Sequence, residues 1–159
     1  MTQQNRTERG AEVRFPPPLV FLGAILLGVG LDVVAPLPLP ADRWTGAVGG
    51  LVLLLSGLAL GAAAHVHFRR TGQHPAPWKP SPELILRGPY RFTRNPMYVG
   101  MSLVQVGIGL LANDLWISFL TVAALAIVHF IAVLPEERYL SAKFEAEYGA
   151  YVARVRRYL

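Results

Sequence analysis

Four long apolar segments constrain the fold of this chain more than any other feature. They cover residues 18–34, 45–68, 97–112 and 115–134. A helix rises ~1.5 Å per residue, so ~20 residues cross the ~30 Å hydrocarbon core of a bilayer. The second and fourth segments are long enough to cross it, whereas the first and third need flanking residues or tilt. The pattern predicts an all-α integral membrane protein with about four transmembrane helices.

The composition supports a membrane protein over a soluble one. Of the 159 residues, 53% are hydrophobic and only 16% are charged, with a mean hydropathy of +0.38. A soluble domain carries about 25% charged residues. The chain has no cysteine, which excludes disulfides, thiolate metal sites and cysteine nucleophiles. The net charge of +5 is compatible with nucleic-acid binding, but the basic residues alternate with the apolar segments, so membrane topology explains them and no nucleic-acid partner is expected.

The distribution of positive charge predicts the orientation. With four spans, the N-terminus, the loop of residues 69–96 and the C-terminal tail share one side. That side holds every one of the 15 lysines and arginines except Arg43. The positive-inside rule therefore places both termini in the cytoplasm. The expected location is the bacterial inner membrane. A cleaved signal peptide is the competing interpretation of residues 18–34, but a three-proline run opens the segment and no small-x-small cleavage site follows.

The chain divides into three parts. Residues 1–15 form a polar tail, expected to be disordered or to lie on the membrane surface. Residues 16–68 hold two transmembrane helices, of which the second is rich in glycine and alanine, a composition that favours close helix packing in lipid. Residues 69–159 hold a cytoplasmic loop, a helical hairpin turning at Asn113-Asp114, and a C-terminal helix. The proline-rich outer loop of residues 35–43 carries no chemistry of its own.

The loop of residues 69–96 is too long and too polar for a simple connector. Ser81 is placed to cap a short helical turn that begins at Pro82. Asn95 is expected to cap the third membrane helix, with Pro96 at its first position. Pro135 should end or kink the fourth segment. Apolar residues recur at helical spacing over residues 136–158, which predicts an amphipathic helix covering the cytoplasmic face.

Charged residues at the cytoplasmic helix ends are the candidate binding groups. Glu136 and Glu137 follow the fourth segment, and adjacent residues of a helix point about 100° apart. We therefore expect at most one of them to enter a shared site. Arg87 and Arg91 are best explained as anchors to anionic lipid. Arg94 lies beside a predicted helix N-terminus, which attracts anions such as carboxylates and phosphates.

The four histidines do not predict a metal site. His65 and His67 are two residues apart, so they face different sides of a helix. No Glu or His lies at metal-ligand spacing beside His129.

The loop and the hairpin together resemble a known superfamily, the isoprenylcysteine carboxyl methyltransferases and phospholipid methyltransferases. The resemblance covers roughly residues 80–156 and depends on the order of its motifs around the hairpin. Those motifs are Gly88-Pro89-Tyr90, then Arg94-Asn95-Pro96-Met97-Tyr98-Val99-Gly100, then Glu136-Glu137 followed by Leu140, Phe144, Tyr148 and Tyr151. The first two spans show only generic similarity.

The resemblance implies an integral membrane enzyme that uses S-adenosylmethionine and methylates a lipid-soluble acceptor, either a prenyl carboxylate or a phospholipid amine. In that superfamily the cofactor lies at the cytoplasmic ends of the helices, and the acceptor enters sideways from the bilayer. Residues 69–159 would be the methyltransferase core. The cofactor-binding residues carried over by position are Glu83, Leu84, Ile85, Gly88, Tyr90, Arg94, Asn95, Pro96, Met97, Tyr98, Glu136 and Glu137. No residue is assigned as a catalytic base, and no oligomeric state follows.

Two departures keep the acceptor open. The carboxyl methyltransferases have His where this chain has Asn95, and the Asn-Pro-Met-Tyr sequence is instead similar to the phosphatidylethanolamine methyltransferases. An arginine that the carboxyl methyltransferases place one turn before the glutamate pair falls here on Ala132. Two other functions fit the same architecture: an NADPH-dependent membrane steroid or isoprenoid reductase, and a non-catalytic membrane scaffold.

Overall fold

The computed structural model describes residues 10, 11, 13, 15–72 and 79–158, and these residues form an all-α membrane protein, as predicted. The elements, in chain order, are α2 (Pro17–Val34), α3 (Arg43–Arg70), the 3-10 turn η1 (Gly88–Arg91), α4 (Pro96–Ala112), α5 (Leu115–Val128), the π turn η2 (His129–Val133) and α6 (Leu134–Val152). Three helices are long and apolar enough to span a bilayer, namely α2, α3 and the continuous α5–η2–α6. The 17 residues of α4 form a shorter apolar helix of ~26 Å.

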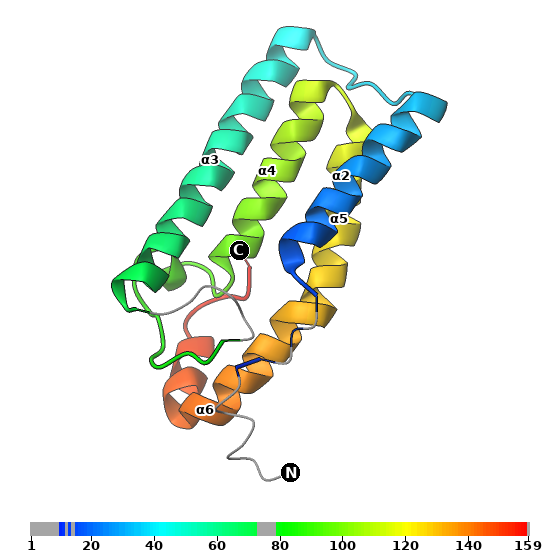
Figure 1. Ribbon diagram of the computed structural model, residues 1–159. Helices are drawn as coiled ribbons and strands as arrows, with labels where there is room; N and C mark the ends of the chain where they lie inside the picture. The colour runs from blue at the N-terminus through cyan, green and yellow to red at the C-terminus, as the bar shows by residue number, and fades with distance from the viewer. Residues whose placement is uncertain (1–9, 12, 14, 73–78, 159) are drawn as a thin grey trace.

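The helices form a bundle in which α4 lies beside α3 and α5, and α2 covers α5 (Figure 1). The loop of residues 79–95, α6 and the C-terminal tail gather at one end of the bundle. The α2–α3 link and the α4–α5 turn lie at the other end (Figure 1). The loop, α6 and the tail therefore share one end, as a four-helix topology requires, and the side of the membrane that this end faces stays a prediction.

Glycines bring α3 and α4 into backbone contact. A methyl group added at Gly57 would lie 2.6 Å from the carbonyl oxygen of Gly100, and one added at Gly50 would lie 2.8 Å from the carbonyl oxygen of Gly107. Neither position has room for a side chain. Small residues permit this close approach in lipid, where apolar surface alone gives helices little reason to associate. We call this contact the glycine seam.

The hairpin of α4 and α5 turns at Asn113 and Asp114, as predicted. Asn113 adopts the left-handed conformation (φ 59°) that ends α4. Asp114 caps the start of α5, because its carboxylate accepts hydrogen bonds from the N–H groups of Trp116 and Ile117. In the middle of the bundle, the Gln105 side-chain amide donates to the Ile117 carbonyl oxygen at 3.0 Å. These bonds fix the two helices in register.

Pro135 does not end the fourth helix. The chain stays helical through Pro135 as far as Phe144, and the wider π turn of His129–Val133 precedes the proline with only Leu134 between them. A π turn widens the spacing of the backbone hydrogen bonds, and so lets the helix continue although proline has no N–H to donate. The helix also stops earlier than predicted, at Val152 instead of residue 158, and it is interrupted at Glu145 (φ 35°).

The C-terminal tail turns back onto the loop that precedes α4. The Arg94 N–H donates to the Arg156 carbonyl oxygen at 2.9 Å, within an isolated parallel bridge between Thr93 and Arg156. The predicted helical turn at Ser81 is wrong, because Ser81 has no regular structure and residues 82 and 83 form bends; the short helix of this loop is η1 instead.

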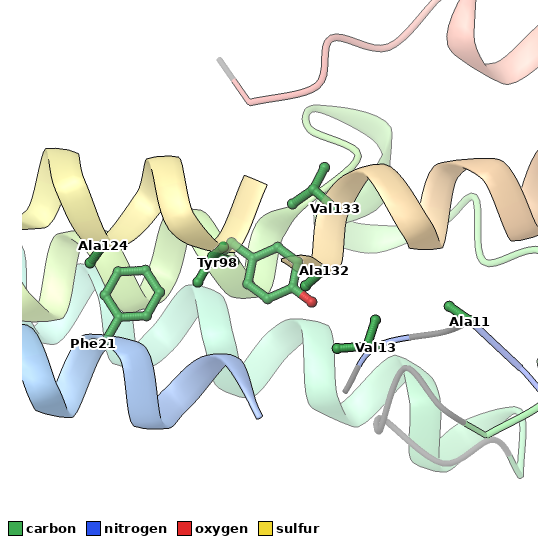
Figure 2. Close-up of a cluster of buried hydrophobic side chains, with 8 residues drawn as sticks. Ala11, Val13, Phe21, Tyr98, Ala124, Ala132 and Val133 are labelled. Atoms are coloured by element: carbon green, nitrogen blue, oxygen red, sulfur yellow. The ribbon is translucent and has the colours of Figure 1, made fainter. Parts of the chain in front are cut away.

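Part of the N-terminal tail is buried. Ala11 and Val13 pack into the apolar cluster that contains Phe21, Tyr98 and Ala132 (Figure 2). At these two positions the tail differs from the expected disordered or surface-lying segment, because the side chains of Ala11 and Val13 fill space between α2 and the hairpin helices. Residues 1–9 of the predicted tail lie outside the described residues.

Candidate functional site

A hollow at the end of the bundle that holds the loop and the tail collects polar and aromatic side chains; we call it the polar pocket. Loop residues form one wall and α6 the other, with the start of α4 beneath. Its lining residues are Phe68, Ser81, Glu83, Leu84, Ile85, Tyr90, Arg94, Asn95, Glu136, Glu137, Leu140, Tyr148 and Tyr151. The loop and α6, whose nearest lining residues Asn95 and Glu136 are 41 positions apart in the sequence, therefore meet in one place.

Most of the residues that sequence comparison indicated lie in this pocket. Eight of the twelve line it: Glu83, Leu84, Ile85, Tyr90, Arg94, Asn95, Glu136 and Glu137. The other four, Gly88, Pro96, Met97 and Tyr98, are not among the lining residues. Of these, Gly88 has a positive φ (61°) and lies against the His67 ring, where a side chain would not fit. Pro96 is buried at the first position of α4, and Tyr98 supports the pocket through a contact with Glu136.

Glu137 is held by two arginines. Arg94 Nη1 lies 3.0 Å from Glu137 Oε1, and the Arg157 guanidinium donates from Nε and Nη2 to the two carboxylate oxygens at 3.0 and 2.8 Å. The side chains of Arg94 and Glu137 are only 11% and 14% exposed. The hydrogen bonds to Glu137 raise the pKa of Arg157 above its usual range. Such paired, charge-assisted contacts fix the geometry of the site.

Glu136 has a different environment. The Tyr98 hydroxyl donates to Glu136 Oε1 at 2.5 Å. Among the described residues, the recorded ion pairs of Arg94 and Arg157 go to Glu137 and not to Glu136. Both glutamates line the pocket, so the prediction that at most one would do so is wrong. The two carboxylates nevertheless divide their tasks, because Glu137 is neutralised by protein and Glu136 is not.

Three buried tyrosines form the aromatic wall of the pocket. The Tyr151 hydroxyl donates to the Tyr90 carbonyl oxygen at 2.7 Å, and the rings of Tyr148 and Tyr151 lie 6.0 Å apart. The ring of Phe68 meets that of Tyr90 edge to face at 6.0 Å. Burial, followed by the nearby charge of Glu136, raises the pKa of Tyr90 above its usual value. Tyr90 therefore stays a neutral aromatic group at physiological pH.

Asn95 occupies the position that begins α4, as predicted, but its side chain does not cap the helix. Its amide instead donates to the carbonyl oxygen of Arg157 at 2.9 Å, and the Thr93 hydroxyl donates to the same oxygen at 3.1 Å. These hydrogen bonds hold the C-terminal tail against the residues that precede α4, and they place the Arg157 guanidinium beside Glu137.

Several residues that build the site were not among the predicted cofactor-binding residues. The resemblance includes Leu140, Tyr148 and Tyr151 in its C-terminal motif without giving them a role, and that motif is the signal that could have assigned them to the pocket. Arg157 lies beyond the end of α6, and no spacing in the sequence links it to Glu137.

Two polar groups remain available to a ligand. Arg94 Nε is buried without a hydrogen-bond partner, and Glu136 lacks a cationic partner among the described residues. A buried donor without a partner costs free energy unless a ligand or water satisfies it. The pocket is therefore suited to a molecule that carries both a cationic and an anionic group, and its aromatic wall can contact that molecule. Within the described parts of the chain, no group of three His, Cys, Asp or Glu side chains is arranged to hold a metal ion.

The pocket is narrow in this structure. Its volume is about 80 Å³, the space of ~3 water molecules. Ser81 N–H donates to the Tyr139 hydroxyl at 3.0 Å, which holds the loop wall against α6. A larger ligand would need this wall to move outward.

Comparison with known proteins gives one family. The family described as phospholipid methyltransferase matches residues 45–147, which is well over half of the chain and includes α3, the loop, the hairpin and most of α6. No curated protein matches the chain significantly.

Proposed function

The chain belongs to the phospholipid methyltransferase family, and from that premise we propose that it transfers a methyl group from S-adenosylmethionine to a lipid-soluble acceptor. Members of this family typically use that methyl donor. We assign the polar pocket as the donor site. The observation that carries this assignment is the position of Glu136, a carboxylate beside buried tyrosines that the arginines of the site leave without an ion pair.

The chemistry of the pocket fits the donor. S-adenosylmethionine supplies an electrophilic methyl group on a sulfonium cation, and it also carries an ammonium, a carboxylate and an adenine ring. Glu136 can accept from the ammonium or from a ribose hydroxyl. The neutral face of Tyr90 can attract the cation, a contact worth ~0.5–2 kcal/mol depending on desolvation. Arg94 Nε, which has no partner, is a donor for the carboxylate.

Methyl transfer requires alignment more than covalent chemistry by the protein. The acceptor attacks the methyl carbon in line with the departing sulfur, so a nucleophilic residue is not needed. Holding the two reactants in this geometry can supply several kcal/mol of the acceleration, about 7–11 kcal/mol in the best-oriented cases. The loop and α6 would act by holding the donor, and the membrane helices by presenting the acceptor.

We further propose that the pocket faces the cytoplasm, because the basic residues gather at its end of the bundle. The absence of native cysteines makes this easy to test. Single cysteines at the exposed positions Arg91 and Asn113 should react with a membrane-impermeant maleimide from opposite sides, the one at position 91 only in inverted vesicles and the one at position 113 in intact cells. The reverse pattern would contradict the orientation.

Calorimetry on the purified protein in detergent tests the donor assignment. We expect binding of S-adenosylmethionine and of its demethylated product, S-adenosylhomocysteine, but not of NADPH. Binding of NADPH alone would favour a reductase, and binding of none of the three would favour a scaffold. Radiolabelled donor, supplied with vesicles of phosphatidylethanolamine or with a prenylated cysteine analogue, then distinguishes the two acceptor classes by the lipid that becomes labelled.

A further inference from the structure

Glu137 has two arginine partners, and they come from different parts of the chain. Arg94 precedes α4, whereas Arg157 belongs to the tail that follows α6. One arginine is enough to neutralise one carboxylate. Arg157 also lies beyond residues 45–147, the region that matches the family, so the family comparison assigns it no role. The contacts of this second arginine indicate what it adds to the site.

The main chain of the tail fixes the position of Arg157. The Arg156 carbonyl oxygen accepts from the Arg94 N–H at 2.9 Å. The Arg157 carbonyl oxygen accepts from the Thr93 hydroxyl at 3.1 Å and from the Asn95 side-chain amide at 2.9 Å. The three residues before α4 therefore hold the backbone on which the Arg157 guanidinium is carried, independently of its ion pair.

The two arginines contact Glu137 in different ways. Arg157 donates from Nε and Nη2 to the two carboxylate oxygens, at 3.0 and 2.8 Å. Arg94 contacts Oε1 through Nη1 at 3.0 Å, and its Nε is buried without a hydrogen-bond partner among the described residues. An arginine and a carboxylate often pair through two parallel hydrogen bonds. Because Arg157 makes that paired contact with Glu137, Arg94 keeps a donor for another anion.

The charges of the polar pocket point to the same role. Arg94 is the one cationic side chain among the described lining residues, which include Glu83, Glu136 and Glu137. A ligand carboxylate beside Arg94 would therefore meet an excess of negative charge. Arg157 Nη2 lies 2.8 Å from Glu137 and brings a second positive charge to it. When Arg157 neutralises Glu137, the attraction of Arg94 for a ligand anion is no longer cancelled.

Stability alone is a weaker explanation for the second arginine. The Arg157 side chain is 39% exposed, and ion pairs with that much solvent contact add little to stability. The hydrogen bonds of the main chain already hold the tail. The groups that Arg157 influences are more deeply placed, since the side chains of Arg94 and Glu137 are 11% and 14% exposed. A charge at Arg157 therefore acts mainly on the interior of the pocket.

We propose that Arg157 is a positioning residue for the methyl donor, and that by binding both oxygens of Glu137 it leaves Arg94 free to bind the donor's carboxylate. This inference rests on the proposed function, because it concerns the same donor site. It also gives that site a specificity, since a donor without the carboxylate gains nothing from Arg157. Arg157 does not contact the donor and contributes no step of methyl transfer.

Two ligands and two variants test this role by calorimetry in detergent. S-adenosylmethionine is compared with its decarboxylated form, which keeps the sulfonium, the ammonium and the adenine ring. Arg157→Gln removes the charge. Arg156→Gln is the matched control, because the Arg156 side chain is exposed and its contact with Arg94 is made by the main chain.

The unsubstituted protein should bind S-adenosylmethionine at least about tenfold more tightly than the decarboxylated form, as expected for a hydrogen bond to a charged group. In Arg157→Gln this preference should fall to about twofold or less, while the Kd of the decarboxylated form does not rise. Arg156→Gln should keep the full preference. Equal weakening of both ligands in Arg157→Gln would overturn the proposal, since it indicates general damage to the pocket.

Arg157→Lys extends the test to a variant that keeps the charge, and it decides the question if Arg157→Gln does not fold. Lysine cannot bind both carboxylate oxygens as the planar guanidinium does, so the preference should fall severalfold, by less than in Arg157→Gln. An unchanged preference in Arg157→Lys, when Arg157→Gln does not fold, would overturn the proposal.

The same titrations separate this inference from the proposed function. If the unsubstituted protein binds S-adenosylmethionine but shows no preference for the carboxylate, or if Arg157→Gln keeps that preference, only the role of Arg157 is wrong. If the unsubstituted protein binds neither ligand nor S-adenosylhomocysteine, the proposed function fails and the role of Arg157 fails with it.

Discussion

The glycine seam and the polar pocket are built on opposite principles. In the seam, Gly57 and Gly100 bring two backbones together so closely that an added methyl group would lie 2.6 Å from a carbonyl oxygen. In the pocket, long side chains from the loop, α6 and the tail contact each other through hydrogen bonds and ion pairs, and Glu136 remains free of the arginines. The seam thus supplies stability without chemistry, and the pocket supplies binding groups at some cost in stability.

Within the pocket, the neighbouring glutamates repeat this contrast. Glu137 serves the structure and Glu136 is available to a ligand. The following predictions separate the two kinds of contact, from the largest expected effect to the smallest.

Removing the charge of Glu137 should have the largest effect on stability. Glu137→Gln leaves the nearly buried guanidinium of Arg94 without its anion, and breaking such a pair costs about 3 kcal/mol. Thermal unfolding in detergent should show a clear decrease in Tm. The matched control is Glu147→Gln on the exposed side of α6, which should unfold like the unsubstituted protein. Equal Tm values for the two variants would contradict the structural role of Glu137.

A single methyl group in the glycine seam should come next. Gly57→Ala forces the backbones of α3 and α4 apart and should cost about 2 kcal/mol. Gly61→Ala, one turn further along α3, meets no atom within 4 Å and should be neutral or slightly stabilising. Denaturant titration in detergent distinguishes them. The Gly57→Ala protein that remains folded should bind the methyl donor with normal affinity. A loss of donor affinity in this variant would contradict the claim that the glycine seam affects stability and not binding.

Changing the aromatic wall should weaken donor binding, and Tyr90→Leu should also cost some stability because Tyr90 is buried against Phe68. Tyr90→Phe keeps the ring face and should bind S-adenosylmethionine within about twofold of the unsubstituted protein, whereas Tyr90→Leu loses a cation–π contact of ~0.5–2 kcal/mol, which corresponds to about 2–30-fold in Kd. Calorimetry measures both. Equal affinities for the Phe and Leu variants would show that the ring face does not contact the cation.

The smallest effect is expected at the hydrogen bond between Tyr151 and the Tyr90 carbonyl oxygen. Tyr151→Phe should lower the free energy of unfolding by about 1 kcal/mol, the usual net value of one hydrogen bond. Hydrogen exchange should become faster in residues 88–91, because η1 loses its link to α6. Unchanged exchange would mean that other contacts hold this turn.

The spans and their packing could be predicted from sequence because each depends on local composition. The apolar runs predicted the three helices long enough to span a bilayer and the shorter apolar helix α4, Asn113-Asp114 predicted the hairpin, and the glycines of α3 indicated close packing. The candidate site was predicted through the resemblance, and eight of its twelve residues do share one pocket.

The remaining features depend on contacts between distant residues. Nothing local marks Arg157 as a partner of Glu137, since 20 residues separate them and the tail must first reverse direction. The π turn before Pro135 is one of several ways to accommodate a proline, and the sequence does not select among them. Burial of Ala11 and Val13 follows from a gap that exists only once α2 and the hairpin are assembled.

The most direct test of the account is the donor affinity of Glu136→Gln. The amide oxygen can still accept from the Tyr98 hydroxyl, so the structural contact is kept and only the charge is lost. Calorimetry with S-adenosylmethionine should show a Kd at least about tenfold higher, as expected for a lost hydrogen bond to a charged group, with the Tm unchanged and with Glu147→Gln binding normally. Equal affinity in the Glu136 variant and the unsubstituted protein would contradict the assignment of this carboxylate to the methyl donor.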